Sequence, residues 1–313
     1  MSIHVNVDNF ARAESDRMFR DLAAAAGGVN RWSHVRRPTP IDAQTVIRMN
    51  RDTLYSFAIV DLREPATITL PDAGERYLSA MVVNEDHYIN QVIHDPGSHV
   101  LDPDVHGTPY VLVAVRTLVD PGDADDVERV GALQDELVLT AGSDVAFEMP
   151  DYDTASLDAT RAPLLQLAAG VGGFDRTFGR REDVDPVRHL LGTAAGWGGL
   201  PETEAFYLNE NPGLPVGEYE LRVADVPVDA FWSISMYDAE GFFRANEFDA
   251  YSLNDLTAAK EDDGSVVVRL GTEPGGARNF LPITEGWNYI VRLYRPRPEI
   301  LDGSWTFPTP VPV

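Results

Sequence analysis

The sequence predicts a mainly β protein with helical insertions, in which two lobes of antiparallel strands flank a helical segment. Short runs with period-two alternation, separated by turn sequences, recur through residues 1–119 and again through residues 201–313. This pattern of short runs and turns is typical of antiparallel sheets rather than of alternating strands and helices. Residues 120–200 instead carry helix start and stop signals. We therefore expect an N-terminal domain with a helix and strands over residues 1–119, a helical connecting segment over residues 120–200 and a C-terminal β domain over residues 201–313.

The N-terminal domain is expected to begin with a helix and to continue in short strands. Asp8 is a suitable N-cap for a helix over residues 9–26, and Gly27 with Gly28 would end it. Turn sequences such as Asp95-Pro-Gly-Ser98 separate the strand candidates that follow. These candidates are residues 53–62, 67–70, 77–83, 88–93 and 110–115.

The connecting segment carries three helix candidates. Pro121-Gly-Asp123 opens the first, and the second covers residues 157–169. Asp185 and Pro186 form the cap and first turn of the third, which ends before Gly196.

Strands return in the C-terminal domain. The strand candidates there are residues 218–223, 230–236, 265–270 and 287–294. The proline-rich tail that follows contains Trp305 and Phe307. Because exposed rings of this size are unfavourable in water, we expect the tail to pack on the domain.

The charge of the chain limits its partners. The 313 residues include 50 acidic and only 25 basic side chains, which gives a net charge of −25. Such a surface repels phosphate backbones and anionic lipids, so we expect neither nucleic-acid nor membrane-surface binding. Two interpretations of the charge stay open: an ordinary acidic surface, and a halophilic surface that keeps the protein soluble at high salt.

The residue types also exclude several chemistries. The chain has no cysteine, which rules out thiol nucleophiles, disulfides and thiolate metal sites. Glycine-rich nucleotide-binding motifs, the Gly-x-Ser-x-Gly elbow and the His-Glu-x-x-His zinc motif are absent. No apolar run is long enough for a transmembrane helix, and the first residues lack the pattern of a signal peptide. We therefore expect a cytoplasmic protein.

A histidine cluster provides a metal-binding alternative. Its members are His87, His94, His99 and His106. If residues 95–98 form a hairpin loop, His94 and His99 face each other with Cβ atoms about 5 Å apart, which suits two ligands of one divalent metal ion. The acidic residues that would add oxygen ligands are Glu85, Asp86 and Asp102. His87 and His94 fall on opposite faces of one strand, so the metal site is the minor alternative, and we predict no cofactor.

Polar groups open the first strand candidate, Asn50-Arg-Asp-Thr-Leu-Tyr-Ser56. Alternation places Asn50 and Asp52 on one face of the strand and Thr53 and Tyr55 on the other. Partial burial would raise the pKa of Asp52 toward the range of a general acid or base. The alternative is an ion pair between Asp52 and an arginine that fixes the start of the strand.

The strand around Trp232 carries a polar-aromatic face. One face has the apolar residues of a core, with Trp232, Ile234 and Met236. The other face has Phe231, Ser233, Ser235 and Tyr237, and this mixture of rings and hydroxyls is typical of a ligand-lined β surface. Neither serine has a histidine nearby in the sequence to activate it, which argues against a serine nucleophile.

Arg292 stands in the middle of the last strand candidate, on the same face as Ile290 and Tyr294. An arginine among apolar neighbours needs a carboxylate, a carbonyl or an anionic ligand. Two alternatives stay open: structural pairing with a carboxylate from the other lobe, and anion binding.

Several of these motifs together resemble a known family. The marks in the N-terminal half are Asn50 to Ser56, Asp61-Leu62 and Arg76-Tyr77. Those in the C-terminal half are Asp229-Ala-Phe-Trp-Ser233, Met236-Tyr-Asp238, Asp263-Gly-Ser265, Asn279-Phe-Leu-Pro282, Trp287 to Pro296 and Leu301-Asp-Gly-Ser-Trp305. From about residue 30 to its end, the chain resembles the tandem family of domains of unknown function 1254 and 1214.

The resemblance implies two antiparallel β-sandwich or jelly-roll-like domains joined by helical segments, and assembly into homo-oligomers. It also pairs the Asn50–Ser56 strand with the Trp232 and Arg292 strands as signature regions, which implies a site between the lobes. The family carries hydrolase-like labels for some members.

The leading hypothesis is a small-molecule enzyme with hydrolase-like or lyase-like acid/base chemistry. Its catalytic residues would be Asp52, Tyr55 and Tyr237. Its substrate-binding residues would be Asn50, Trp232, Ser233, Arg292 and Tyr294, with Arg292 holding an anionic group. The competing hypotheses are a non-catalytic ligand-binding or assembly protein, in which the same residues lock the lobes together, and a metal-dependent enzyme that uses the histidine cluster.

Overall fold

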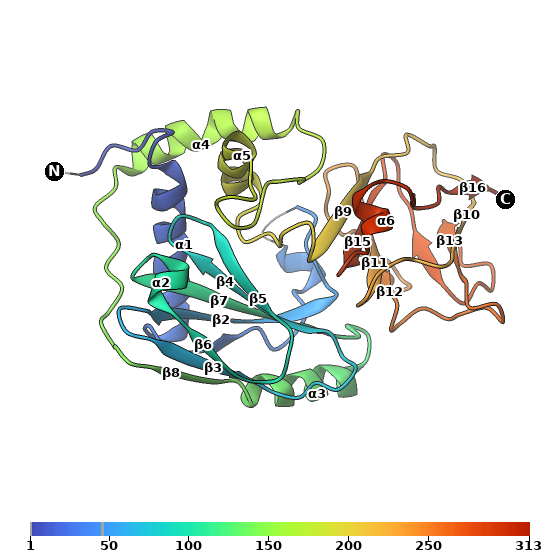
Figure 1. The fold of residues 1–313 in the computed structure, drawn as a ribbon. Helices are drawn as coiled ribbons and strands as arrows, with labels where there is room; N and C mark the ends of the chain where they lie inside the picture. Colours follow the sequence, from blue (N-terminus) through green and yellow to red (C-terminus); the bar gives the residue numbers. More distant parts are fainter. Residues whose placement is uncertain (1, 45–46) are drawn as a thin grey trace. The chain divides into compact units, whose positions relative to one another are not determined.

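The computed structural model describes residues 2–44 and 47–313 and confirms a mainly β protein with helical insertions (Figure 1). The chain divides into two compact units, each discontinuous in sequence. The N-terminal unit comprises Met1–Arg36, Leu54–Leu118 and Asp125–Pro201. The C-terminal unit comprises Arg37–Thr53, Val119–Ala124 and Glu202–Val313.

The N-terminal unit contains two sheets. The five-stranded sheet consists, in spatial order, of β1 (Ser33–His34), β2 (Thr53–Asp61), β7 (Tyr110–Leu118), β4 (Leu78–Asn84) and β5 (Ile89–Ile93). The three-stranded sheet consists of β6 (Gly97–Leu101), β3 (Ala66–Leu70) and β8 (Val138–Ala141). The pairs β1–β2, β4–β5, β4–β7, β3–β6 and β3–β8 are antiparallel, as the short strands predicted.

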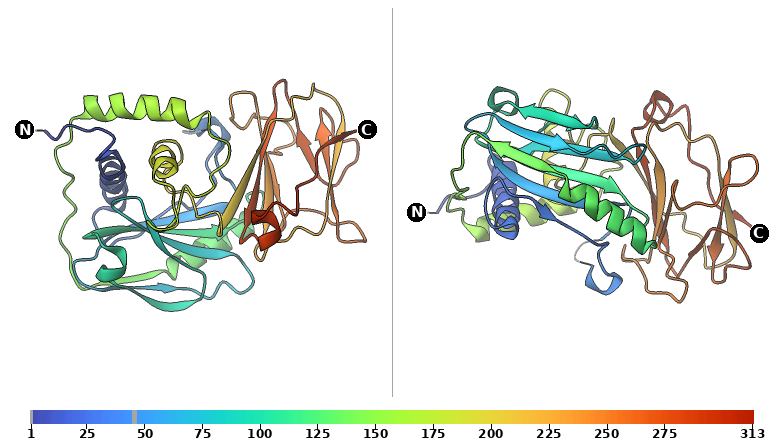
Figure 2. Two further views of the ribbon diagram at one scale, coloured as in Figure 1. Left: turned by 45° about the horizontal axis from the view of Figure 1, so that its top comes forward. Right: turned by 90° about the horizontal axis from the view of Figure 1, so that it is seen from below.

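Alternate residues of these strands form a core between the two sheets. Val60 of β2, Ile68 of β3 and Val113 of β7 are fully buried in it. Every residue of β7 is buried, which means that the five-stranded sheet is covered on both faces. The three-stranded sheet covers one face and helices lie on the other side (Figures 1 and 2).

The helices of this unit are α1 (Phe10–Ala26), α2 (Pro103–His106), α3 (Ala124–Asp135), α4 (Thr154–Ala168) and α5 (Pro186–Ala195). Phe10 of α1, Leu157 of α4 and Leu191 of α5 meet in a core cluster that holds these three helices together.

The ends of two helices test the predicted caps. Asn9, not Asp8, is the N-cap of α1, and its side chain bonds to Asn6 and His4 before the helix instead of to a helical N–H. At the other end, Gly27 has φ 76° and its N–H reaches back to the last carbonyls, as predicted. Asp185 caps α5 as predicted.

The C-terminal unit is a β-sandwich of two four-stranded sheets. One sheet consists of β14 (Phe280–Pro282), β13 (Val266–Gly271), β10 (Tyr219–Val223) and β16 (Val311–Pro312). The other consists of β12 (Ser252–Asn254), β11 (Trp232–Tyr237), β15 (Asn288–Tyr294) and β9 (Ala205–Glu210). The pairs are antiparallel except β13 with β14, which is parallel.

The sandwich encloses one core, in which Leu221, Ile234, Val268 and Val291 are fully buried. Two short helices complete the unit, the 3-10 helix η1 (Ile41–Ala43) and α6 (Pro298–Leu301). Trp305 and Phe307 of the proline-rich tail pack against the core, which confirms that the tail lies on the domain.

Among residues 2–44 and 47–313, no helix is long and apolar enough to cross a membrane.

Candidate functional site

The two central strands of the β12-β11-β15-β9 sheet have the alternation that the sequence predicted. The residues that face the sandwich core are Trp232, Ile234 and Met236 of β11 and Tyr289, Val291 and Leu293 of β15. The intervening residues, among them Ser233, Tyr237 and Arg292, are directed to the outer face, where Ser233 lies directly opposite Arg292 in the strand register. The polar groups of both strands therefore share one surface.

The segment before β2 covers this outer face. Ile41 and Met49 pack against a cluster that includes Tyr237 and Ile290. The amide of Asn50 donates a hydrogen bond of 3.0 Å to the hydroxyl of Tyr294. These contacts bury the polar face inside the C-terminal unit instead of leaving it open to solvent.

Asp52 comes from the covering segment and is 0% exposed. Ser233 Oγ donates a hydrogen bond of 2.5 Å to Asp52 Oδ2, and Arg292 Nη1 lies 4.0 Å from the same oxygen. Burial raises the pKa of Asp52, while Arg292 and the Ser233 hydrogen bond oppose this effect. Within the described residues, Oδ1 has no hydrogen-bond partner.

Arg292 is held mainly by neutral oxygen atoms. Nη1 donates to Ser235 Oγ at 2.8 Å, and Nη2 donates to Tyr237 Oη at 3.0 Å. Nη2 also reaches the carbonyl oxygens of Arg48, at 2.9 Å, and Met49, at 3.3 Å. The Tyr237 hydroxyl in turn donates to the Met49 carbonyl at 2.7 Å. We call Asp52, Ser233, Ser235, Tyr237 and Arg292 the Arg292 network.

The guanidinium and the hydroxyls of the Arg292 network form their hydrogen bonds with one another, with Asp52 Oδ2 and with carbonyls of the covering segment. Arg292 is 3% exposed and Tyr237 is 2% exposed, so neither side chain presents its polar end to solvent. Burial raises the pKa of Tyr237, with Arg292 acting against it. This geometry corresponds to the alternative in which Asp52 pairs with an arginine.

The other predicted site residues are distributed differently. The ring of Tyr294 stacks on the ring of Phe231, with 4.1 Å between the centroids. Its hydroxyl lies beside the network and accepts the hydrogen bond from Asn50. Trp232 faces the sandwich core, on the opposite side of the sheet from the network. Tyr55 lies in the N-terminal unit, where its ring stacks on Phe57 and the Arg116 guanidinium lies 5.4 Å from the ring centroid.

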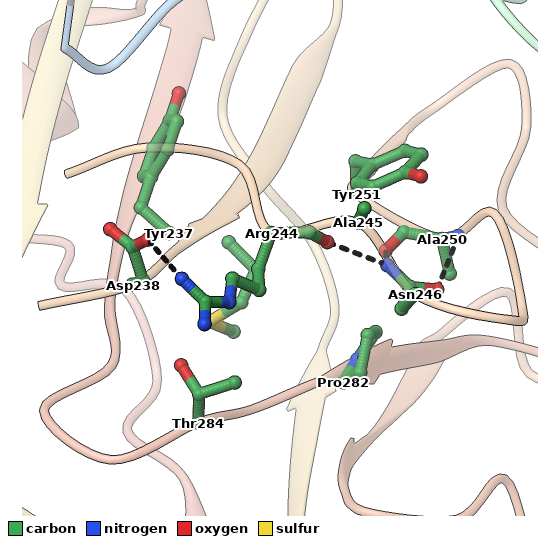
Figure 3. Close-up of a pocket in the computed structure, with 10 residues that line it drawn as sticks. Tyr237, Asp238, Arg244, Ala245, Asn246, Ala250, Tyr251, Pro282 and Thr284 are labelled. Atoms are coloured by element: carbon green, nitrogen blue, oxygen red, sulfur yellow. Dashed lines mark hydrogen bonds and ion pairs between the residues drawn. The ribbon is translucent and has the colours of Figure 1, made fainter. Parts of the chain in front are cut away.

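A small cavity of about 70 Å³ opens next to Tyr237 in the same unit (Figure 3). We call it the Arg244 pocket, and it is lined by Met236, Tyr237, Asp238, Arg244, Ala245, Asn246, Ala250, Tyr251, Pro282 and Thr284. Tyr237 belongs both to the Arg292 network and to the wall of this pocket. The buried network therefore fixes one wall of an accessible cavity.

Asp238 and Arg244 supply the charges of the pocket. Asp238 Oδ1 accepts hydrogen bonds from the N–H groups of Glu240, at 3.1 Å, and Phe242, at 2.9 Å. Asp238 Oδ2 lies 3.9 Å from Arg244 Nη1, which is too long for a hydrogen bond. The Asp238 side chain is 11% exposed and that of Arg244 is 72% exposed. The arginine is thus held loosely at the mouth of the pocket.

Sequence reasoning missed this pocket. The turn Asp238-Ala-Glu-Gly241 was visible, and Gly241 does have φ 90°. The loop that carries Arg244, Asn246 and Tyr251 has no regular pattern that places it over β11. The only signal was an aspartate at the end of a polar-aromatic strand.

The predicted hairpin at residues 95–98 is wrong. β5 pairs with β4, and β6 pairs with β3, so the chain crosses from one sheet to the other at this point. His94 Nδ1 lies 3.3 Å from the Leu78 carbonyl and His99 Nε2 lies 2.8 Å from the Asp95 carbonyl. The reason is that β5 belongs to the five-stranded sheet and β6 to the three-stranded sheet, so the turn between them connects two layers.

The remaining histidines are buried in separate surroundings. His87 Nε2 accepts from the Gly198 N–H, and its Nδ1 is 2.8 Å from Thr193 Oγ1. His106 is 1% exposed, and burial lowers its pKa to about 4. In the part of the chain that the structure describes, no group of three histidine, aspartate or glutamate side chains is arranged to hold a metal ion.

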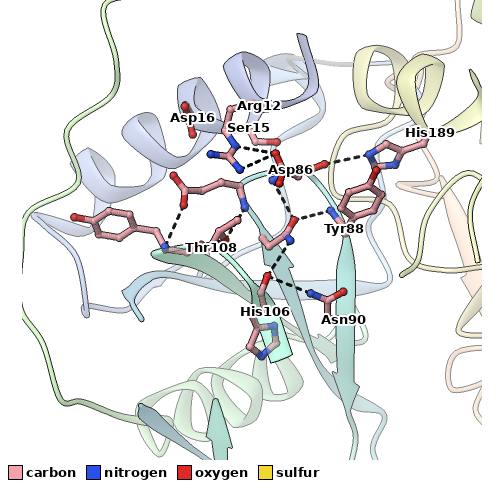
Figure 4. Close-up of polar contacts among 12 residues, drawn as sticks. Arg12, Ser15, Asp16, Asp86, Tyr88, Asn90, His106, Thr108 and His189 are labelled. Atoms are coloured by element: carbon pink, nitrogen blue, oxygen red, sulfur yellow. Dashed lines mark hydrogen bonds and ion pairs between the residues drawn. The ribbon is translucent and has the colours of Figure 1, made fainter. Parts of the chain in front are cut away.

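A second charged cluster lies in the N-terminal unit, where α1 meets the turn between β4 and β5 (Figure 4). We call Arg12, Asp16, Glu85 and Asp86 the Arg12 cluster. Arg12 Nη2 pairs with Asp86 Oδ1 at 2.7 Å. Tyr152 donates to Asp16 Oδ2 at 2.8 Å.

The two buried carboxyls of this cluster hold protons unusually well. Burial raises the pKa of Glu85 to about 7, with Arg12 opposing and Asp16 adding to the shift. Burial also raises the pKa of Asp16 to about 6, against the Tyr152 hydrogen bond and the Arg12 charge. From the sequence alone, Glu85 is a candidate only as an oxygen ligand for a metal ion. Its neighbours on α1 are distant in the chain, so no local pattern indicates that they surround it.

Comparison with known proteins gives two family matches. Residues 29–102 match the model described as protein of unknown function DUF1254, and residues 209–298 match protein of unknown function DUF1214. Both matches confirm the resemblance found in the sequence. No curated protein matches the chain.

Two solved structures have a similar fold. The VPA0106 protein from Vibrio parahaemolyticus is 17% identical, with a TM-score of 0.75 over 98% of this chain and 97% of that chain. An uncharacterized protein from Burkholderia cenocepacia is 14% identical, with a TM-score of 0.55 over 97% of this chain and 86% of that chain. At such identities the likeness shows the fold alone.

Proposed function

The chain is a tandem DUF1254–DUF1214 protein, and we propose that it binds a small molecule with an anionic group in the Arg244 pocket of its C-terminal unit. The observation that carries this proposal is an arginine held loosely at the mouth of a cavity. Arg244 has one ion pair within the described residues, and that pair is 3.9 Å long. Its guanidinium is therefore available to a ligand.

The chemistry of the lining supports an anionic ligand. A guanidinium presents a planar fork of N–H donors that matches a carboxylate or phosphate. Met236 and Pro282 supply apolar contacts, and Thr284 supplies a hydroxyl beside the charge.

The Arg292 network supports the pocket from behind. It fixes Tyr237 through the hydrogen bonds of its hydroxyl to Arg292 and to the Met49 carbonyl. A wall that is already ordered costs less conformational entropy on binding than a mobile one. In this proposal the signature residues position the pocket, and they do not touch the ligand through Asp52 or Arg292.

Binding accounts for the geometry better than the acid/base enzyme. Asp52 is 0% exposed and already accepts a hydrogen bond from Ser233. A general base has to come within hydrogen-bond reach of the proton that it removes. The Arg244 pocket offers a cation and a carboxylate for recognition, and this arrangement is sufficient for a binding protein.

The test is thermal shift followed by calorimetry with a panel of small anions: acetate, propionate, lactate, pyruvate and inorganic phosphate. A ligand that binds only the native state stabilises it by about 2.7 kcal/mol at 100 times its Kd. Arg244→Gln should weaken the best ligand about 10-fold to 100-fold, because a charged hydrogen bond contributes about 1.5–3 kcal/mol.

Arg222→Gln is the matched control, since Arg222 is an exposed arginine of the same unit that pairs with Asp263 at 2.6 Å. It should leave the affinity unchanged. Failure of every anion in the panel to bind, or equal binding by wild type and Arg244→Gln, would contradict the proposal.

A further inference from the structure

The Arg244 pocket contains a carboxylate as well as a cation, and both are incompletely paired. We infer that its ligand is a small zwitterion of the α-amino-acid type, whose carboxylate binds Arg244 and whose ammonium group binds Asp238. This inference rests on the proposed function, because it concerns the same pocket. It goes further by assigning a positive charge to the ligand and a binding role to Asp238.

The orientation of Asp238 prepares one oxygen for a ligand. The backbone N–H groups of Glu240 and Phe242 both donate to Oδ1, which fixes the plane of the carboxylate. Oδ2 faces Arg244 instead, and the 3.9 Å separation leaves this pair without a hydrogen bond. The Asp238 side chain is only 11% exposed. A carboxylate oxygen with so little access to water gains most from a hydrogen-bond donor that carries a positive charge.

The relative position of the two charges matches a zwitterion. Figure 3 shows Arg244 extended toward Asp238, with Thr284 beside them, and Met236 also lines the pocket. A simple anion would satisfy Arg244 but would approach Asp238 Oδ2 with like charge. A simple amine would pair with Asp238 but would approach Arg244 with like charge. A molecule with both charges on neighbouring atoms satisfies both side chains at once, which is the condition for specificity.

The volume of the cavity limits the size of the ligand. A closed cavity of about 150 Å³ holds a benzene molecule with six heavy atoms. The 70 Å³ of the Arg244 pocket therefore encloses roughly three non-hydrogen atoms in proportion. Because Arg244 is exposed at the mouth, the rest of the ligand lies there. Glycine and alanine have the right size, with a short side chain against Met236 or Pro282.

The decisive experiment compares three probes of nearly equal shape by calorimetry: alanine, propionate and isopropylamine. Wild-type protein should bind alanine at least 10-fold more tightly than either of the other two. Asp238→Asn keeps the Oδ1 acceptor for the two backbone N–H groups but removes the negative charge. It should therefore lower the affinity for alanine at least 10-fold and leave the affinity for propionate the same or higher.

The outcomes separate this inference from the proposed function. If propionate binds as tightly as alanine and Asp238→Asn has no effect on alanine, the zwitterion inference is overturned while anion binding at Arg244 stands. If neither alanine nor propionate binds, the zwitterion inference is overturned, and the proposed function is overturned with it only if every other anion of its panel also fails to bind.

Asp263→Asn is the control for charge removal at an exposed carboxylate of the same unit, and it should change no affinity. A thermal unfolding curve of Asp238→Asn that matches wild type in the absence of ligand shows that the turn is intact. If the turn is disturbed, Arg244→Lys provides a second measurement: it keeps the charge but loses the planar fork, so alanine and propionate should both weaken.

Discussion

Each unit of the protein contains an arginine beside buried carboxylates, and the two arrangements differ in what surrounds the cation. In the C-terminal unit, Arg292 is 3% exposed and is bound by hydroxyls and carbonyl oxygens, with Asp52 at 4.0 Å. In the N-terminal unit, the Arg12 side chain is 36% exposed and pairs directly with Asp86. Arg292 is therefore held mainly by neutral hydrogen-bond acceptors, whereas Arg12 is held by an ion pair that is partly exposed to solvent.

This difference determines which group can change its protonation. The four hydrogen bonds of Arg292 to neutral groups hold whether or not Asp52 is charged. In the Arg12 cluster, a single cation faces three carboxyls, and two of them have pKa values of about 6 and about 7. We therefore regard the Arg292 network as a permanent part of the fold and the Arg12 cluster as a group that titrates near neutral pH.

The largest expected effect comes from Arg292→Met. This change leaves the Asp52 carboxylate without its cation, and it removes the hydrogen bond from Arg292 to the Arg48 carbonyl. Removing one partner of a buried charged group costs about 3–5 kcal/mol. Urea unfolding, followed by circular dichroism, should show a loss of that size.

The matched control is Arg222→Met on β10, where the arginine is exposed and pairs with Asp263. Its unfolding midpoint should stay close to that of wild type. Equal losses in the two variants would show that the network does not stabilise the fold more than a surface pair does.

The sequence was sufficient to predict this network in part. Alternation along residues 230–236 and 287–294 separated core from polar face, because each strand covers the sandwich with one side only. An arginine within an apolar strand required a carboxylate, a carbonyl or an anionic ligand, and the structure places the Asp52 carboxylate 4.0 Å from it. The partners that bind it most closely are main-chain carbonyls, and a sequence pattern carries no information about those.

Other parts of the fold and site had no local signal. The short strands β1, β8, β12 and β16 exist because a longer neighbour pairs with them, and their own sequences show no clear alternation. The crossing at residues 95–98 looks like a hairpin turn, since Asp-Pro-Gly-Ser suits either connection. The Arg12 cluster joins a helix to a distant turn, so its raised pKa values depend on tertiary packing alone.

The second prediction concerns pH and Glu85→Gln. In the unfolded chain glutamate has a pKa of about 4.3, while in the folded protein the pKa of Glu85 is about 7. Between these values the native state binds one more proton, so its stability is greatest below about pH 4.3 and is lost as the pH rises through 7. Glu85→Gln keeps the neutral form at every pH.

At pH 8 this variant should therefore be more stable than wild type, by about 1–2 kcal/mol after allowance for solvent screening. Below about pH 4.3 the two should be nearly equal. Thermal unfolding in a buffer series from pH 4 to pH 8 measures the difference, with Glu75→Gln on an exposed turn as the control. A difference that does not depend on pH would refute the assignment of a titrating carboxyl to position 85.

The smallest expected effect comes from Arg12→Gln, and it completes the comparison. Arg12 lowers the pKa of both Glu85 and Asp16, so its removal raises both values and lets these carboxyls take up protons near pH 7. The lost cation is thereby replaced in part by protons. We expect a loss of only about 0.5 kcal/mol at low salt, and less in 1 M NaCl, because the Arg12–Asp86 pair is partly exposed and screened. Salt-dependent unfolding measures this loss. A loss as large as that of Arg292→Met, and independent of salt, would mean that the two arginines are held in the same way.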